Sequence, residues 1–150
     1  MSEALALRHA DPRVQRIIDF YEGLAPDNLA RLGQVYAAQA RFKDPFNEVQ
    51  GLSAIAHIFS HMFATLVAPR FAVITAVAGG DDLFLTWDFR FRRRGSGAVL
   101  MCIHGASHLR LDPDGRVVLH RDYWDAAEEL YEKLPLIGAL MRWLKRRAAG

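Results

Sequence analysis

The chain has 150 residues, of which 51% are hydrophobic and 24% are charged, so it is long and apolar enough to fold as one domain around its own core. Lys and Arg outnumber Asp and Glu by 19 to 17, a balance that disfavours nucleic acid as a partner. The single Cys102 excludes an internal disulfide or a zinc site built from cysteines, and no apolar run reaches the ~20 residues that cross a membrane.

The first half of the chain is predicted to be largely helical. After a loose lead-in at 1–11, apolar residues at helical spacing predict helices over 12–22, 26–36 and 51–68. The run ARFKDPF at 40–46 is typical of a short extended segment, because the residue before a proline avoids the helical conformation.

Four strands are predicted to follow, joined by turns rich in Gly and Asp. They cover 71–78, 83–93, 99–111 and 117–124. The strand at 83–93 alternates most clearly, because large apolar residues recur at every second position with polar residues between them. The apolar positions are Leu83, Leu85, Trp87, Phe89 and Phe91.

The tail at 125–147 is predicted to be helical. Asp125 can cap it, with Glu128 three residues further on, and Pro135 should kink or interrupt it before an apolar stripe leads to the basic run at 145–147. Helices followed by hairpin-linked strands predict an α+β fold with helices on one face of an antiparallel sheet. Such a sheet either fills its interior or leaves an apolar cavity, and periodicity does not decide between them.

Asp44 is the first candidate for chemistry. It lies two residues after Phe42, so strand alternation places both side chains on one face, where apolar neighbours favour a neutral carboxyl suited to proton transfer. The alternative is that Asp44 and Pro45 form a turn in which the carboxylate accepts hydrogen bonds from nearby backbone N–H groups.

His120 and Asp122 form a second candidate pair, since alternation places both on one strand face together with Trp124. If this face points inward, an acid, an imidazole and an indole line one cavity, and either His120 or Asp122 can act as a base. Both faces of the strand contain apolar residues, so a surface salt bridge from Asp122 to an arginine is the alternative.

The other histidines and the cysteine are predicted to be structural. His57 and His61 share a helix face, but the glutamate of an HExxH zinc motif is missing, so a solvated face is the better interpretation. His104, His108 and Cys102 share a strand face that indicates a sheet exterior or a subunit contact, and nothing near Cys102 in sequence activates it as a nucleophile. No motif for a metal, nucleotide or flavin occurs, so we expect no cofactor.

The order of elements and several motifs resemble the nuclear transport factor 2-like (SnoaL-like) superfamily. The resemblance covers residues 13–145 and rests on the two N-terminal helices, the ARFKDPF segment, the helix opening at Gly51 and the strands ending in DGRVVLHRDYWD. It implies a cone, in which a strongly curved antiparallel sheet wraps around the N-terminal helices and encloses an apolar pocket. It also implies a homodimer formed through the sheet.

Within this superfamily, the ketosteroid isomerases resemble the first half of the chain. Their catalytic base lies in an Asp-Pro element, and Asp44 falls at that position. The tyrosine and the protonated aspartate that hold the enolate oxygen in those enzymes correspond here to Phe20 and Ser107. Phe20 cannot donate a hydrogen bond and Ser107 is a weaker donor, so the chain departs from the isomerase pattern.

The limonene epoxide hydrolases resemble the second half of the chain. In those enzymes a strand ending in an Arg-Asp-Tyr-Phe-Asp-like run supplies an aspartate that activates water together with an arginine and a second aspartate. Asp122 in HRDYWD matches the first of these. The partners would come from the strand at 83–93, where Asp88 and Arg90 face away from the apolar side.

The resemblance also implies which side chains line the pocket. Asp44, Asp122 and His120 are the predicted catalytic residues. The predicted ligand-binding residues are Phe20, Tyr36, Phe59, Phe63, Trp87, Phe89, Ser107, Leu109 and Trp124. A pocket of this composition suits a lipophilic, ring-containing ligand.

These observations favour a small-molecule pocket protein, predicted to be a cofactor-independent isomerase, dehydratase, cyclase or hydrolase that uses carboxylate acid–base chemistry. The alternatives are a lipophilic-ligand binding protein without chemistry and a protein-interaction module on the same fold. Because the lead-in lacks the pattern of a secretion signal, we expect a cytoplasmic protein without stable membrane insertion.

Overall fold

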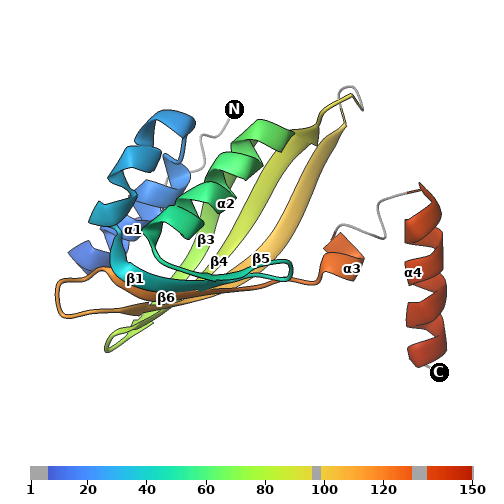
Figure 1. Cartoon of the computed structure of the whole chain (residues 1–150). Helices are drawn as coiled ribbons and strands as arrows, with labels where there is room; N and C mark the ends of the chain where they lie inside the picture. Colours follow the sequence, from blue (N-terminus) through green and yellow to red (C-terminus); the bar gives the residue numbers. More distant parts are fainter. Residues whose placement is uncertain (1–6, 96–98, 130–134, 150) are drawn as a thin grey trace, which may run out of the picture.

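A computed structural model of the chain describes residues 7–95, 99–129 and 135–149 (Figure 1). The start of the predicted lead-in, most of the predicted loop at 95–97 and the middle of the predicted tail, at 130–134, lie outside the described residues. The described elements follow one another in an order that places helices first, then the long strands, then a helical tail.

Helix α1 (Pro12–Glu22) begins where the sequence predicts it. The Asp11 carboxylate accepts a hydrogen bond from Arg13 N at 2.9 Å and so caps the first turn. The apolar stripe of α1 is buried and comprises Val14, Ile17, Ile18 and Tyr21. This helix therefore carries a tyrosine hydroxyl into the interior of the fold.

Two of the predicted helices have different bounds in the structure. The second is a 3-10 helix, η1 (Pro26–Gln34), and Tyr36 begins strand β1 instead of extending the helix. Helix α2 (Leu52–Thr65) ends four residues before Pro69, because the chain pairs with the sheet from Leu66 onward. Pairing in a sheet satisfies the same backbone N–H and C=O groups as a helix does, so tertiary contacts decide between the two.

The sheet has six strands in the order β2-β1-β6-β5-β4-β3. The predicted antiparallel run from β3 to β6 is confirmed, and β1 extends it by pairing in parallel with β6. A parallel pair is possible here because a long stretch of chain, not a hairpin, connects β1 to β6. The strands are β1 (Tyr36–Lys43), β2 (Glu48–Gln50), β3 (Leu66–Gly79), β4 (Asp82–Arg93), β5 (Leu100–Leu111) and β6 (Val117–Tyr123).

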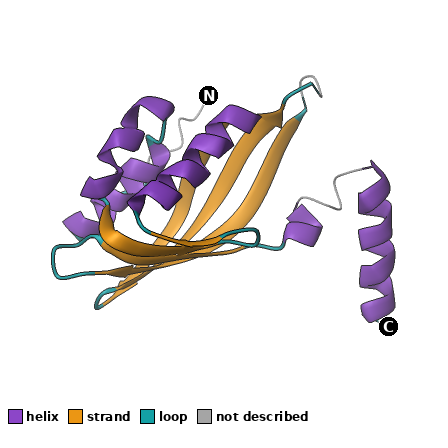
Figure 2. Cartoon of the chain, viewed as in Figure 1, coloured by secondary structure: helices purple, strands orange, loops and turns teal. Residues whose placement is uncertain are grey.

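The sheet is strongly curved and does not close, as the predicted cone requires, and the helices α1, η1 and α2 cover its concave face (Figures 1 and 2). The edge strand β3 shows one source of curvature, because its register shifts between Val67 and Arg70, next to Ala68 at φ 50°. Pro69 lies within this shift, and an edge strand tolerates a residue that has no N–H to donate.

The alternation predicted for β4 is confirmed, since its five apolar positions, Leu83 to Phe91 in steps of two, are all buried. β5 buries Met101, Ile103, Ser107 and Leu109 on the same face. These inward rows pack against the buried stripe of α1 and form the core.

The tail forms α3 (Ala126–Glu129) and α4 (Pro135–Ala148), which lie to one side of the sheet (Figure 1). Asp125 Oδ1 accepts a hydrogen bond from Glu128 N at 3.1 Å, in agreement with the predicted cap. Pro135 stands at the first turn of α4, a position where proline fits a helix. Among the described residues, no helix combines the length and the apolar character needed to cross a membrane.

Candidate functional site

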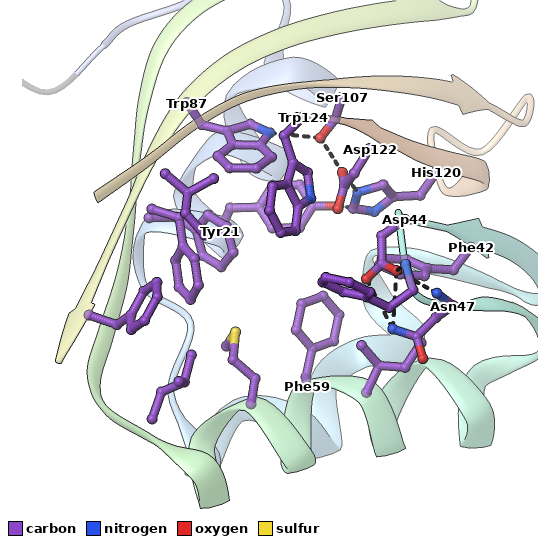
Figure 3. Close-up of a pocket in the computed structure, with 18 of the residues that line it drawn as sticks. Tyr21, Phe42, Asp44, Asn47, Phe59, Trp87, Ser107, His120, Asp122 and Trp124 are labelled. Carbon is purple, nitrogen blue, oxygen red and sulfur yellow. Dashed lines mark hydrogen bonds and ion pairs between the residues drawn. The ribbon is translucent and has the colours of Figure 1, made fainter. Parts of the chain in front are cut away.

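A cavity of about 320 Å³ lies between α2 and the concave face of the sheet (Figure 3). Most of its wall is apolar, and its polar groups include Asp44, Asn47, Ser107, His120 and Asp122. Aromatic rings supply much of the apolar wall, namely Phe42, Phe59, Phe71, Trp87, Phe89 and Trp124. A cavity of this size and lining suits a small lipophilic molecule.

Asp122 of β6 is held by neighbours that the sheet brings to it. It lies opposite Ser107 of β5 in the antiparallel register. Ser107 Oγ donates to Asp122 Oδ1 at 2.5 Å and accepts from Trp87 Nε1 at 2.8 Å. His120, two residues before Asp122 on the same strand face, contacts the same carboxylate oxygen through Nε2 at 2.5 Å. One oxygen of the carboxylate is therefore fixed by two side chains.

Two buried tyrosines lie behind His120. Tyr36 Oη is 2.6 Å from His120 Nδ1, and the Tyr21 and Tyr36 hydroxyls are 2.5 Å apart. Burial raises the pKa of both hydroxyls, so both stay protonated and can donate. With Tyr36 as the donor to Nδ1, the imidazole of His120 carries its proton on Nε2 and donates it to the Asp122 carboxylate.

The second carboxylate oxygen of Asp122, Oδ2, faces the cavity. Oδ2 accepts no hydrogen bond from the described residues. Every buried side-chain oxygen or nitrogen of those residues has a hydrogen-bond partner, so Oδ2 is not buried and is accessible to a ligand. The Asp122 side chain is 16% exposed and lines the cavity. The network therefore orients the carboxylate and leaves one basic oxygen for a ligand.

Asp44 lines the same cavity but is engaged in a turn. Its Oδ1 accepts hydrogen bonds from Phe46 N at 2.8 Å and from Asn47 N at 2.6 Å, and Asn47 Nδ2 lies 3.1 Å from both carboxylate oxygens. This is the Asp-Pro turn that the sequence left as the alternative to a catalytic acid. The carboxylate of Asp44 is committed to the conformation of the loop between β1 and β2.

The structure brings eight of the twelve predicted site residues to the cavity wall: Asp44, Phe59, Trp87, Phe89, Ser107, His120, Asp122 and Trp124. The other four lie elsewhere. Tyr36 is fully buried behind His120, Leu109 is fully buried in the core, and Phe20 packs against that core from α1. Phe63 points from α2 toward a separate groove next to the end of α1.

Tyr21 and Asn47 are site residues that the sequence analysis did not assign. Tyr21 lies on the buried stripe of α1, and the need of a buried tyrosine hydroxyl for a hydrogen-bond partner is the signal that could have found it. Asn47 gives no signal in the sequence, because its role depends on the loop that folds it back to Asp44.

The outer face of the sheet carries a different polar cluster. Within the described ranges, donor atoms of Asp88, Cys102 and His104 lie within 4.8 Å of one another. His104 Nδ1 is 2.6 Å from Asp88 Oδ1, and Arg90 Nη2 is 3.3 Å from Asp88 Oδ2, so both oxygens are already paired in a surface ion pair. Asp88 and Arg90 thus face away from the cavity, as strand alternation predicts, and supply no partner to Asp122.

An α+β cone with ionisable side chains at an apolar cavity defines a class of small proteins in which the cavity is the natural site of ligand binding. The family model of the SnoaL-like domain matches residues 17–120, and the chain belongs to this family. The resemblance stated from the sequence motifs is thereby confirmed. A comparison with curated proteins gives no match.

Three solved structures with the same fold illustrate what this chain is similar to. A hypothetical protein with a ketosteroid isomerase-like fold from Catenulispora acidiphila, in complex with trimethylamine, has 17% identity and a TM-score of 0.68, over 81% of this chain and 92% of that one. A candidate SnoaL-like polyketide cyclase from Shewanella putrefaciens has 17% identity and a TM-score of 0.68, over 81% and 98%. An LEH-like epoxide hydrolase from M. tuberculosis has 14% identity and a TM-score of 0.62, over 78% and 83%. At these identities the similarity establishes the fold alone.

Proposed function

We propose that the protein is a cofactor-independent enzyme that isomerises, dehydrates, cyclises or hydrolyses a lipophilic, ring-containing small molecule. The observation that carries this proposal is the Asp122 carboxylate, with one oxygen held by Ser107 and His120 and the other facing an apolar cavity. Membership of the SnoaL-like family supports a small-molecule substrate. The cyclase and the epoxide hydrolase on the same fold support the reaction classes.

Asp122 is proposed as the general base and acid. In an isomerisation or cyclisation, Oδ2 takes a proton from a carbon next to a carbonyl and returns it to another atom of the product. In a hydrolysis, Oδ2 takes a proton from water while the water oxygen bonds to the substrate carbon and the C–O bond breaks. The protonated Asp122 then returns this proton to the oxygen released from the C–O bond. A carboxylate held rigidly at an apolar wall loses little orientation entropy in either step.

His120 and the two tyrosines are proposed as positioning residues. His120 donates to Oδ1, and Tyr36 fixes the tautomer that makes this donation possible. Asp44 is proposed to shape the cavity rim through its turn, since its Oδ1 already accepts hydrogen bonds from Phe46 and Asn47. In this proposal Asp122 carries out the proton transfer, whereas Asp44 has a structural role in the loop.

The test is turnover of a panel of lipophilic cyclic ketones, enones and epoxides by Asp122→Asn and, as a matched control, by Asp44→Asn. We expect Asp122→Asn to lower kcat about 10²–10⁴-fold, the usual contribution of a general base. Asp44→Asn keeps an acceptor oxygen for the turn and should stay within tenfold of wild type. Both variants should melt close to the wild-type temperature. Loss of turnover in Asp44→Asn alone would contradict the assignment.

A lipophilic-ligand binding protein without chemistry is the second candidate, and a protein-interaction module on the same fold is the third. The mostly apolar lining and Phe20, which lies off the cavity and offers no donor, favour simple binding. Native mass spectrometry of the purified protein distinguishes the candidates. A ligand that co-purifies equally with wild type and Asp122→Asn, with no turnover of the panel, would support a binding protein.

We also propose a homodimer formed through the outer face of the sheet in a cytoplasmic protein. Val77 and Phe84 lie opposite each other on this face and are both exposed, and the His108 ring stacks on Phe84 with centroids 4.6 Å apart. Light scattering on Phe84→Lys tests this proposal. A mass that stays at the wild-type dimer value would argue against this face as the interface.

A further inference from the structure

Helix α4 exposes a row of large apolar side chains. Leu140, Trp143 and Leu144 are 52%, 45% and 45% exposed. At about 100° of rotation per residue, the three side chains fall within an arc of about 100° and form one face of the helix. The α4 apolar face, defined by these three residues, lies on a helix that stands to the side of the sheet and next to α3 (Figure 1).

The same helix concentrates the positive charge of the chain. Arg142, Lys145, Arg146 and Arg147 lie within Pro135–Ala148, which contains no acidic residue. Since the whole chain has 19 basic and 17 acidic residues, acidic residues outnumber basic ones outside α4. By helical geometry, Arg142 and Lys145 point roughly opposite the apolar face, and Arg146 points to one side of it.

The last cation lies in line with the apolar face, since by the same rotation Arg147 falls between Trp143 and Leu144 around the helix. The Arg147 guanidinium carbon is 5.0 Å from the centroid of the Trp143 ring, so this side chain runs along the apolar face and ends in a charge. Lys145 pairs with Glu128 of α3 at 3.5 Å, which orients the basic side of α4 toward the rest of the protein at this point. Trp143 and Arg147 together give the C-terminal end of α4 an apolar surface that carries a positive charge.

We propose that α4 docks the protein on the surface of an anionic lipid bilayer. An apolar face that includes tryptophan, beside a strongly cationic face, is the composition of helices that lie in the plane of a membrane interface. Trp favours this region because its ring is apolar and its N–H is polar, and each nearby cation contributes about 1 kcal/mol of attraction to anionic headgroups. Long Lys and Arg side chains reach the headgroups from positions above the apolar layer.

The geometry favours adsorption and not insertion. With 14 residues, α4 is about 21 Å long at 1.5 Å per residue, against a hydrocarbon core of about 30 Å. A docked α4 would hold the cavity close to a store of lipophilic molecules. This last consequence rests on the proposed function, whereas the docking itself does not.

The test is flotation of the full chain with phosphatidylcholine vesicles, with and without phosphatidylglycerol. Wild type should bind the anionic vesicles and release them at high salt. Arg142→Glu/Arg146→Glu/Arg147→Glu should bind about 100-fold more weakly, as expected from about 1 kcal/mol for each lost cation. Arg31→Glu/Arg41→Glu/Arg116→Glu, a matched change at exposed arginines outside α4, should bind like wild type.

A second variant separates the apolar contribution from the charge. Leu140→Ser/Leu144→Ser should lower binding to anionic vesicles about tenfold, with an unchanged circular dichroism spectrum of the folded domain. Asp122→Asn should bind vesicles like wild type, so loss of catalysis and loss of docking are independent results. Equal binding of wild type to both vesicle types, or none to either, would overturn the proposal. A change of oligomeric state in the α4 variants without vesicle binding would instead assign the face to a second copy.

Discussion

Gly105 provides a sharp test of the packing behind the site. It lies on β5 directly opposite Trp87 of β4, and the Trp87 indole occupies the space beside its Cα. A Cβ at this position would lie 2.4 Å from Cη2 and 2.6 Å from Cζ2 of Trp87, whereas carbons in contact are normally about 3.5–4.0 Å apart. Gly105→Ala therefore requires the indole to move by about 1 Å or more.

Two contacts determine how much Gly105→Ala should lower the free energy of unfolding. Overpacking a buried ring costs about 1–3 kcal/mol, and the hydrogen bond from Trp87 Nε1 to Ser107 Oγ, worth about 1 kcal/mol, is weakened at the same time. We expect Gly105→Ala to lower the free energy of unfolding by about 2–4 kcal/mol. Because Ser107 also donates to Asp122, the orientation of this carboxylate should change as well.

Urea denaturation followed by circular dichroism measures the effect. Gly79→Ala is the matched control, since a Cβ there meets no atom within 4 Å, and it should change the free energy of unfolding by less than about 0.5 kcal/mol. In the Trp87→Phe background the cost of Gly105→Ala should shrink by at least about 1 kcal/mol, because the smaller ring leaves room for the methyl group. A wild-type stability for Gly105→Ala, or a cost that is the same in both backgrounds, would refute this reasoning.

Three further predictions concern the polar groups of the site. Since burial holds Tyr21 and Tyr36 neutral in the folded state, the unfolded chain loses these protons first above pH 10, and the free energy of unfolding should fall by up to about 1.4 kcal/mol per pH unit for each tyrosine. Tyr21→Phe should reduce this alkaline slope in urea titrations, and an unchanged slope would contradict the assignment. Ser107→Ala removes the acceptor of Trp87 Nε1 and should destabilise the fold by about 1–3 kcal/mol in the same assay. Asp44→Ala should lower the free energy of unfolding by about 1–2 kcal/mol through loss of the turn, while turnover stays within tenfold. A loss of turnover comparable to that of Asp122→Asn would make Asp44 the base.

The β4 strand shows what local pattern predicts well. Its period of two predicts that Trp87 and Phe89 point inward and that Asp88 and Arg90 point outward. In the structure Trp87 and Phe89 are buried, and Asp88 and Arg90 form an ion pair on the outer face. β3 shows the opposite, because residues 66–68 were predicted to be the end of the preceding helix, and the structure pairs the chain with β4 from Leu66 onward. The local spacing of apolar residues cannot predict that a segment pairs with a strand later in the chain.

For this protein, the order of elements, the alternation of the long strands and the choice of Asp44 and Asp122 as candidate acids follow from sequence alone, because they depend on neighbours within a few residues. Which acid is available for a ligand was decided only by tertiary structure. Asp44 folds onto Asn47 in its own loop, whereas the carboxylate of Asp122 is oriented by Ser107 from the adjacent strand and by His120. His120 in turn depends on Tyr36, 84 residues away in the chain. Hydrogen bonds between such distant residues exist only after the sheet has curved and the helix has packed into it, so no periodicity can reveal them.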